Sequence, residues 1–256
     1  MRVLILGGTT EAAQLARLLS DDPRFAPTLS LAGRTAQPAL PGTSYRIGGF
    51  GGSEGLARWL ADQRIDAIVD ATHPFAARIS ENAVVAARET RIPFASIVRP
   101  AWIAQAGDRW TMVESAESAA RALGARPARV LLTIGRSELA AFKAAPMHSY
   151  VARSVDAPAS ENLPPTTELI LQRGPFDAAA EEQLLRDRRI EIVVAKNSGG
   201  DATYAKIAAA RKLGLPVVMI ARPPKPAGLA LPDAAAAQAW LVSLVRAHDA
   251  ASERGV

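Results

Sequence analysis

The chain has 256 residues, of which 49% are hydrophobic and 5% aromatic, and its formal net charge is +5. This length and composition suffice to bury the core of one large domain or two small ones, which excludes an intrinsically disordered chain. The absence of cysteine excludes disulfide frameworks, thiolate nucleophiles, zinc ribbons and iron–sulfur ligation, and we expect no metal site. A reducing cytoplasm is the expected location.

The basic residues are spread evenly, with net charges of +2 for residues 1–128 and +3 for residues 129–256. Because no basic stripe or tail stands out, nucleic acid is not an expected partner. Of the basic residues 25 are Arg and 5 are Lys, which fits either a GC-rich coding bias or guanidinium groups that bind carboxylates and phosphates. No apolar stretch approaches the roughly 20 residues of a membrane helix, and the first one is too short for a signal peptide.

Short apolar runs alternate with turns and helical patterns along the first part of the chain. Apolar residues at helical spacing occupy residues 11–19, directly after the first run and its glycines. Strands buried on both faces with helices between them are typical of a parallel α/β sheet, in which all strand C-termini meet at one edge. The expected strands are residues 3–6, 28–31, 45–47, 67–69 and 94–98.

The second part of the chain repeats the first. Residues 2–13 match residues 129–140 at an offset of 127, and residues 64–100 match residues 189–223 at offsets of 125 and 123. The pattern indicates two copies of one α/β unit; a chance similarity between unrelated α/β segments is the alternative.

This repeat predicts two lobes with a ligand cleft between them. Residues 1–100 form the first lobe, and residues 129–256 the second, with a helix at 233–248 that closes the chain. Residues 101–128 are a connector and the leading element of the second lobe, and they contain a helix at 115–123. In two-lobed α/β proteins the ligand commonly lies between the lobes, facing the strand C-termini.

The turn Gly7-Gly8-Thr9-Thr10 lies between the first strand and its helix. Its backbone N–H groups and the positive helix end suit a phosphate, although the G-x-G-x-x-G pattern is absent. The threonine hydroxyls fit a phosphate contact or a helix cap equally well.

The second strand ends in Gly33-Arg34. In a dinucleotide-binding fold this position lies beside the adenosine ribose, where an arginine pairs with the 2′-phosphate of NADP. Arg34 therefore favours NADP over NAD, unless it is a solvated surface residue.

Two further loops follow strands at the same edge. Residues 48–52 read GGFGG, which fits close backbone approach to a flat ligand, with Phe50 as a stacking wall, or a flexible loop. Residues 70–75 read DATHPF and contain His73, one of three histidines, for which a structural and a catalytic role are both open.

In the second lobe, the repeat places two polar loops at the equivalent edge. They are Gly135-Arg136-Ser137 and the segment Lys196-Asn197-Ser198-Gly199-Gly200, which together predict an anion site. Lys196 is the strongest single candidate, because it follows the buried strand 192–195, where a charge needs a partner.

Taken together, the motifs GGTTEAAQLA, GGFGG, DATHPFA and KNSGGDATYAKIAAARKLGLPVVMIARP resemble the precorrin-6A reductase family of cobalamin biosynthesis. The resemblance covers residues 1–223. It implies two Rossmann-like lobes and an NADPH-dependent reductase that delivers hydride to a methylated, ring-contracted tetrapyrrole and yields precorrin-6B. The chemistry requires no metal or thiol, because the cofactor holds the reactive hydride.

Our mechanistic hypothesis places NADPH on the first lobe and the tetrapyrrole, whose acetate and propionate groups are anionic, under the second. It also allows transfer to neighbouring pathway enzymes. The proton donor stays open between His73, water and a substrate propionate. The expected catalytic residues are His73 and Lys196; the cofactor-binding ones Gly7, Gly8, Thr9, Thr10, Glu11, Gly33, Arg34, Gly49, Phe50, Gly51, Asp70, Ala71 and Thr72; and the substrate-binding ones Arg136, Ser137, Lys196, Asn197, Ser198 and Gly199.

Two alternative functions belong to other classes. A two-lobed nucleotide-sugar or phosphate-ligand enzyme would show no dependence on NADPH, and a non-enzymatic two-lobed binding protein would oxidise no cofactor. Within the reductase prediction, the sequence leaves open whether the substrate is metal-free or contains cobalt.

Overall fold

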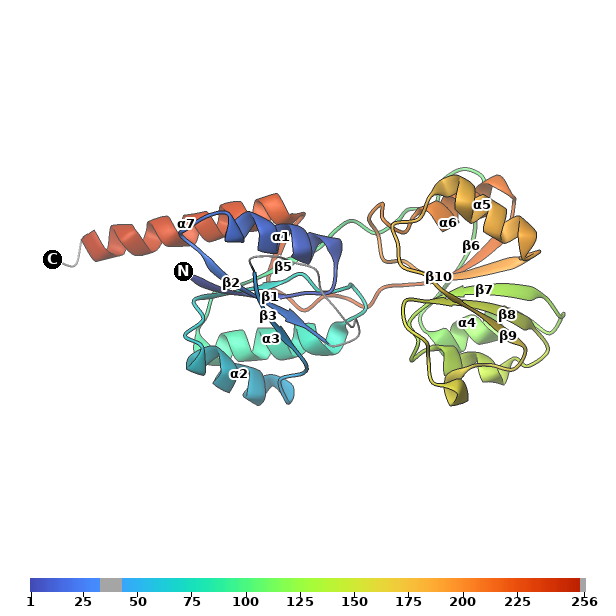
Figure 1. Cartoon of the computed structure of the whole chain (residues 1–256), viewed down its shortest axis with the longest axis horizontal. Helices are drawn as coiled ribbons and strands as arrows, with labels where there is room; N and C mark the ends of the chain where they lie inside the picture. Colours follow the sequence, from blue (N-terminus) through green and yellow to red (C-terminus); the bar gives the residue numbers. More distant parts are fainter. Residues whose placement is uncertain (33–42, 254–256) are drawn as a thin grey trace. The chain divides into compact units, whose positions relative to one another are not determined.

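The structure is a computed structural model that describes residues 1–32 and 43–253, apart from the side chains of residues 248 and 251–253. The chain divides into two compact α/β units, Met1–Arg99 with Pro224–Val256, and Pro100–Pro223 (Figure 1). Among the described helices, none is both long and apolar enough to span a bilayer.

The first unit contains a six-stranded sheet with the order β12-β5-β4-β1-β2-β3, in which every neighbouring pair is parallel. This order places β1 near the centre, with the chain winding outward on both sides of it. The elements are β1 (Arg2–Leu6), α1 (Thr10–Ser20), β2 (Ala26–Leu31), β3 (Ser44–Ile47), α2 (Gly52–Asp62), β4 (Ala67–Asp70), α3 (Ala77–Thr90), β5 (Phe94–Ile97), β12 (Leu229–Leu231) and α7 (Ala234–Glu253).

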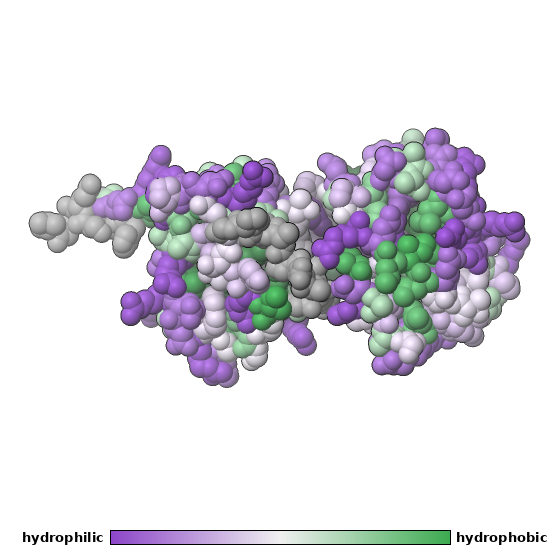
Figure 2. Space-filling model, viewed as in Figure 1, coloured by the Kyte–Doolittle hydropathy of each residue, from purple (hydrophilic) through white to green (hydrophobic). Residues whose placement is uncertain are grey.

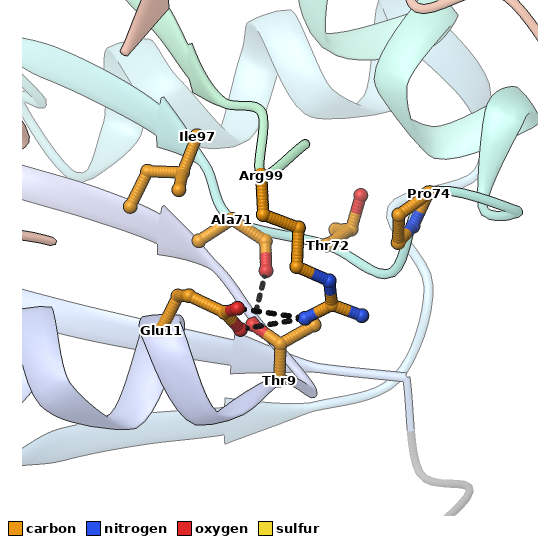
Figure 3. A pocket seen from close by; sticks show the side chains of 7 residues that line it. All are labelled: Thr9, Glu11, Ala71, Thr72, Pro74, Ile97 and Arg99. Carbon is orange, nitrogen blue, oxygen red and sulfur yellow. Dashed lines mark hydrogen bonds and ion pairs between the residues drawn. The ribbon is translucent and has the colours of Figure 1, made fainter. Parts of the chain in front are cut away.

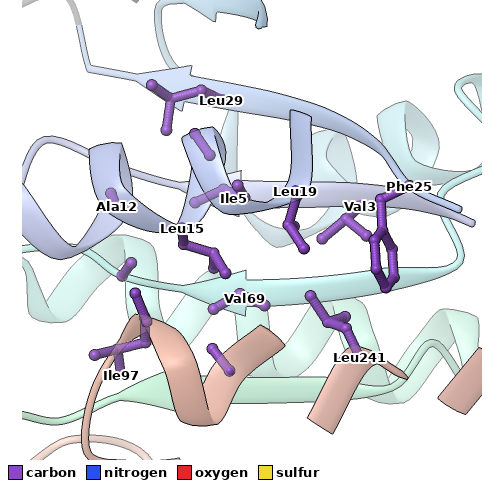
Figure 4. Close-up of a cluster of buried hydrophobic side chains, with 14 of the residues drawn as sticks. Val3, Ile5, Ala12, Leu15, Leu19, Phe25, Leu29, Val69, Ile97 and Leu241 are labelled. Atoms are coloured by element: carbon purple, nitrogen blue, oxygen red, sulfur yellow. The ribbon is translucent and has the colours of Figure 1, made fainter. Parts of the chain in front are cut away.

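Helices cover both faces of this sheet: α1 and α7 lie on one face, α2 and α3 on the other (Figure 1). Successive residues of β1 face opposite layers, so Val3 and Ile5 pack with α1 and α7 (Figure 4), while Leu4 and Leu6 pack with α2 and α3. All four side chains are essentially inaccessible to solvent. An apolar run without alternation is therefore what a central parallel strand requires.

The second unit has the sheet order β6-β11-β10-β7-β8-β9, again parallel throughout. Helices α5 and α6 cover one face and α4 lies on the other (Figure 1). Where the first unit has α1, the second has only the short 3-10 helix η1. The elements are β6 (Arg109–Val113), α4 (Ala116–Ala122), β7 (Arg129–Thr133), η1 (Leu139–Ala144), β8 (Ser149–Ser154), η2 (Ser160–Asn162), β9 (Thr167–Leu171), α5 (Ala178–Asp187), β10 (Ile192–Lys196), α6 (Ala205–Lys212) and β11 (Pro216–Ile220).

The predicted repeat is visible in backbone contacts as well as in strand order. The backbone N–H of Arg2 donates to the Asp66 carboxylate over 2.6 Å, and the N–H of Arg129 donates to the Glu191 carboxylate over 2.8 Å. Both acceptors lie just before the strand that pairs with the first strand of their unit, β4 or β10. The predicted fold class, two repeated α/β units with parallel sheets, is confirmed.

The boundary between the lobes differs from the prediction, because each half of the chain gives its sixth strand to the other sheet. Strand β6 follows β5 along the chain but pairs with β11, and β12 follows β11 but pairs with β5. Residues 224–256, assigned from the sequence to the second lobe, thus belong to the first unit. The physical reason is packing: Ala234, Ala237 and Leu241 of α7 are fully buried in the core that α1 covers.

Five of the large apolar side chains that the structure exposes lie on the outer strands of the two sheets. They are Tyr45 and Ile47 on β3, Met112 on β6, Leu171 on β9 and Leu229 on β12. Figure 2 shows an apolar area on the second unit, over the region where Figure 1 places β9. An outer strand has one neighbour only, so its side chains are less covered than those of inner strands.

Candidate functional site

The loops predicted to bind a cofactor gather at the carboxyl edge of the first sheet. Three backbone hydrogen bonds of 2.9 Å fasten them to neighbouring strands: Gly7 N–H donates to Ser30, Gly48 N–H to Leu31, and Ala71 N–H to Leu6. The parallel topology thus brings residues 7–11, 48–52 and 70–76 to one edge, as expected. Gly33 and Arg34 lie outside the described residues.

The glycine turn after β1 presents open backbone next to the start of α1. Gly8 has a φ of +112°, a conformation that favours glycine, and no atom lies within 4 Å of where its Cβ would be. The Thr9 hydroxyl is used within the protein, since it accepts from Ala12 N–H over 3.2 Å and donates to the Ala71 carbonyl over 2.6 Å. Thr9 is therefore the N-cap of α1, whereas the exposed Thr10 makes no such contact among the described residues.

A small open pocket, whose volume of about 200 Å³ includes open solvent, lies beside this turn (Figure 3). Inside it, Arg99 donates from Nη1 to both carboxylate oxygens of Glu11, each over 2.8 Å. Burial is the largest single influence on the pKa of Glu11 and raises it, but the hydrogen bonds and charge of Arg99, with hydrogen bonds from the Glu11 backbone and Thr9, together leave the pKa below its usual value. The pocket is lined by Thr9, Glu11, Ala71, Thr72, Pro74, Ile97 and Arg99.

The GGFGG loop is held by a side chain that the sequence did not single out. Arg46 donates to the carbonyls of Gly48 and Gly49, each over 2.9 Å, and its guanidinium lies 3.8 Å from the centre of the Phe50 ring. The Phe50 carbonyl approaches α2 so closely that a Cβ at Gly55 would lie 1.8 Å from it. Specific contacts therefore fix this loop, while Gly49 and Gly51 face open space.

Asp70 is completely buried and belongs to a polar cluster at the end of β4. Its carboxylate accepts from Lys225 over 2.6 Å and, at the other oxygen, from the Thr72 hydroxyl and N–H over 2.6 and 3.0 Å. Lys225 also donates to Ser80 over 2.9 Å. Burial is the largest single influence on the pKa of Asp70 and raises it, but the charge and hydrogen bond of Lys225, together with hydrogen bonds from Ser80 and Thr72, lower the pKa below its usual value. Asp70 and Thr72 thus bind the loop after β4 to Lys225, which lies where the chain re-enters the first unit.

His73 lies half-buried in the loop after β4, next to Pro74 of the pocket. Its Nδ1 accepts from the Phe75 N–H over 3.3 Å, and the two rings lie 5.7 Å apart. An accepting Nδ1 places the proton of the neutral imidazole on Nε2.

In the second unit, some predicted anion-binding residues are exposed to solvent, whereas Lys196 is engaged in an ion pair. Arg136 and Ser137 lie exposed on the turn after β7, which leads into η1. Lys196, at the end of β10, forms an ion pair with Glu138, whose carboxylate also accepts from Gly135 N–H over 3.1 Å. Lys196 thus already has an anionic partner.

The segment after Lys196 contacts residues 100–102, where the chain enters the second unit. The Asn197 side chain accepts from the Trp102 N–H over 2.8 Å and donates to the Trp102 carbonyl over 3.0 Å. Gly199 has a φ of +67°, and a Cβ there would lie 2.1 Å from the Pro100 carbonyl. Ser198 is buried. Structural contacts account for Asn197 and Gly199, whose predicted role in substrate binding stays a prediction.

Beneath this segment lies a buried cluster of three charged residues. Arg153 and Glu181 form an ion pair in which both side chains are under 5% exposed. Lys206 is 5% exposed, donates to the Thr203 carbonyl over 2.6 Å and lies 5.2 Å from the centre of the Trp102 ring. Burial, reinforced by the nearby Arg153 and opposed by Glu181, lowers the pKa of Lys206 to about 7. The protonation state of this lysine therefore changes near neutral pH.

Comparison with known proteins identifies the family. The family described as "Precorrin-6x reductase CbiJ/CobK" matches residues 2–242. The chain belongs to this family. A precorrin-6A reductase from Sinorhizobium sp is 55% identical over 86% of this chain and 85% of its own length. A precorrin-6A reductase from Rhodobacter capsulatus is 45% identical over 100% of this chain and 99% of its own length. A solved CobK precorrin-6A reductase has a TM-score of 0.90, with 45% identity over 95% of this chain and 96% of that one.

Family membership confirms the resemblance seen in the motifs, and the structure confirms the predicted fold class. Sequence reasoning missed Arg46, Gly55, Arg99 and Lys225, which fix the loops of the first unit. Two signals pointed to such residues: Asp70 ends a buried strand and so needs a partner, and Arg99-Pro100 recurs as Arg222-Pro223.

Replacing Lys225 tests the buried cluster. Lys225→Met leaves the Asp70 carboxylate buried without its cation, so we expect the free energy of unfolding to fall by about 3–5 kcal/mol. The double variant Asp70→Asn/Lys225→Met removes both charges and should recover part of this loss. Urea-induced unfolding measures the free energies of unfolding of both variants. Wild-type stability in Lys225→Met would contradict the role of Lys225 as the partner of the buried Asp70 carboxylate.

Replacing Lys206 tests the second cluster. Because the folded-state pKa of Lys206 lies near 7 and that of an unfolded lysine about 10.4, the unfolded chain binds the extra proton between these values. Wild-type stability should therefore rise with pH over this window, and in Lys206→Met the rise should be reduced. Unfolding curves from pH 7 to 9.5 measure it, with the exposed Lys212→Met on the same helix as control. Parallel profiles for wild type and Lys206→Met would refute the burial argument.

Proposed function

We propose that this protein reduces a double bond of precorrin-6A to give precorrin-6B in cobalamin biosynthesis, with NADPH as the hydride donor. The observation that carries the proposal is the family match over residues 2–242, together with 45–55% identity to proteins named precorrin-6A reductase. Relatives named cobalt-precorrin-6A reductase, such as the one from Salmonella typhimurium, are 30% identical. This difference supports the metal-free substrate.

The residues of the first unit fit a nicotinamide dinucleotide. Gly8, Gly49 and Gly51 leave open space where side chains would otherwise stand, which permits close approach of a flat ligand to the backbone. Gly7, Gly8 and Thr10 would hold the diphosphate at the start of α1, and Arg34 the 2′-phosphate. When bound, the reduced nicotinamide supplies a hydride to one ring carbon, and a proton is added at the neighbouring carbon.

The chain's own residues then bind, orient and compensate charge. The substrate's acetate and propionate groups need cations, for which Lys196 and Arg136 of the second unit are the candidates. Since Lys196 is paired with Glu138, a substrate carboxylate would replace Glu138 as its partner. His73 would donate the proton from Nε2, the ring nitrogen that the Phe75 contact leaves protonated.

The assay that tests the function follows NADPH absorbance and the visible spectrum of the tetrapyrrole, with precorrin-6A and its cobalt form supplied in turn. Substrate-dependent NADPH oxidation is expected with the metal-free form. A nucleotide-sugar enzyme or a binding protein would oxidise no NADPH.

Arg34→Ala tests the cofactor choice. Loss of a charge-assisted contact costs about 1.5–3 kcal/mol, so the affinity for NADPH should fall roughly tenfold or more while the affinity for NADH stays unchanged. Dissociation constants for both cofactors measure the ratio. Arg24→Ala, which removes an exposed arginine paired with Asp22, is the control. An equal effect on both cofactors would remove Arg34 from the 2′-phosphate site.

His73→Ala tests the proton donor. General acid catalysis contributes roughly 10²–10⁴-fold, so kcat should fall by a factor in that range while the dissociation constant of NADPH is retained. Single-turnover reduction of bound substrate separates the two quantities. Unchanged turnover would assign the proton to water or to a substrate propionate.

A further inference from the structure

Arg46 lies on β3, directly beside the end of β2 in the first sheet. The strand register pairs it with Ser30, and its Nη1 donates to the Ser30 hydroxyl over 2.8 Å. The Ser30 carbonyl in turn accepts from the Gly7 N–H of the glycine turn over 2.9 Å. Because Arg46 also donates to the carbonyls of Gly48 and Gly49, its guanidinium lies at the edge where the candidate cofactor loops meet.

The guanidinium of Arg46 has neutral partners only among the described residues. Its acceptors are one hydroxyl and two backbone carbonyls, and the Phe50 ring lies against one of its faces. No carboxylate in the described part of the chain forms an ion pair with it, and burial lowers the pKa of Arg46. A partly buried cation is costly unless an anion compensates it. The charge of Arg46 therefore calls for an anionic ligand.

The contacts of Arg46 leave donor groups of the guanidinium for such a ligand. Nη1 makes two of the three hydrogen bonds and Nη2 makes one, whereas Nε makes none with a described residue. An arginine carries two hydrogens on Nη2 and one on Nε. Neighbouring N–H groups of one planar fork are the donors that bind phosphate oxygens well.

The sequence on both sides of Arg46 contains no carboxylate. Residues 23–53, which include β2, β3 and the chain between them, have no Asp or Glu and three arginines, Arg24, Arg34 and Arg46. In dinucleotide folds that bind NAD, an acidic residue after β2 accepts from the ribose 2′-hydroxyl, whereas an arginine nearby accommodates the 2′-phosphate of NADP. This segment supplies no such acidic acceptor, and Arg46 supplies a cation.

We propose that Arg46 binds the 2′-phosphate of the dinucleotide and thereby sets the preference for NADP over NAD. The inference rests on the proposed NADPH-dependent reduction and adds a residue of β3 to it. Arg46 has two separable effects on binding. Its contacts with Gly48 and Gly49 shape the GGFGG loop for both cofactors, whereas its charge favours the cofactor with the additional phosphate. The ratio of the two affinities isolates the effect of the charge.

Titration of the full-length protein with two pairs of probes tests the inference. NADP⁺ and NAD⁺ differ only in the 2′-phosphate, and so do adenosine 2′,5′-bisphosphate and 5′-AMP. Arg46→Gln should weaken binding of the 2′-phosphorylated member of each pair, relative to the other member, by about tenfold or more, because a charge-assisted contact is lost. Isothermal titration calorimetry measures the dissociation constants.

Three further variants separate the charge from the structure of the loop. Arg46→Lys keeps the charge but not the planar fork, so its preference for NADP⁺ should lie between those of wild type and Arg46→Gln. Phe50→Leu removes the ring beside the guanidinium without a change of charge, so it should affect both members of each pair equally. Arg24→Gln, which changes an exposed arginine paired with Asp22, should alter none of the constants. Thermal unfolding shows whether each variant is folded at the temperature of the titration.

An unchanged ratio of NADP⁺ to NAD⁺ affinity in Arg46→Gln would overturn the inference. The same shift of this ratio in Phe50→Leu would also overturn it, because the effect would then belong to the loop. Failure of the proposed function looks different, since the wild-type protein would then oxidise no NADPH with either tetrapyrrole. Wild-type turnover of NADPH with a ratio indifferent to Arg46 would remove this inference alone.

Discussion

Each sheet of this protein takes its outer strand from the other half of the sequence. Strand β6 completes the sheet whose other strands follow it, and β12 completes the sheet whose other strands lie more than 130 residues earlier. The chain therefore passes between the units twice, at Arg99–Pro100 and at Pro223–Pro224. The second unit is one continuous segment, whereas the first is completed by β12 and α7 from the C-terminal part of the chain.

Polar side chains fix both crossings at the loops where ligands are expected. Arg99 binds Glu11 in the first turn of α1, and Lys225 binds Asp70 at the end of β4. On the side of the second unit, Arg222 donates to the Asn197 carbonyl over 3.2 Å, and the Asn197 side chain holds the backbone of Trp102. A glycine at 199 lets Pro100 approach that same loop. The crossings and the candidate binding loops are thus held by one set of contacts.

The sequence predicted the fold well because parallel sheets leave strong local signals. Apolar runs such as residues 3–6, followed by glycines and a helical pattern, specify a buried strand and its crossover without further information. The repeat then located the equivalent strands of the second unit. Motifs identified the family, and the topology brought the predicted loops of the first unit to one edge.

The strand exchange and the residues that fix the loops were not predicted, because they depend on contacts between residues far apart in sequence. A parallel strand of three residues such as β12 has no local signature that names its neighbour, so the exchange of outer strands was missed. Lys225 lies among prolines, 155 residues from Asp70, and no periodicity links the two. The same holds for Arg46 and Phe50: their residue types are visible, but the stacking of guanidinium on ring is a property of the folded loop.

One cation at each candidate edge is paired in the protein alone, Arg99 with Glu11 and Lys196 with Glu138. A basic group held in this way costs less to bury than an unpaired one, and it stays at the site before the ligand arrives. Under the proposed function, a substrate carboxylate would replace Glu138 at Lys196, so its affinity would depend on the difference between two ion pairs. For an enzyme whose hydride comes from a cofactor, such placed and neutralised cations supply what the protein must add: orientation of two polyanions without an excess of buried positive charge.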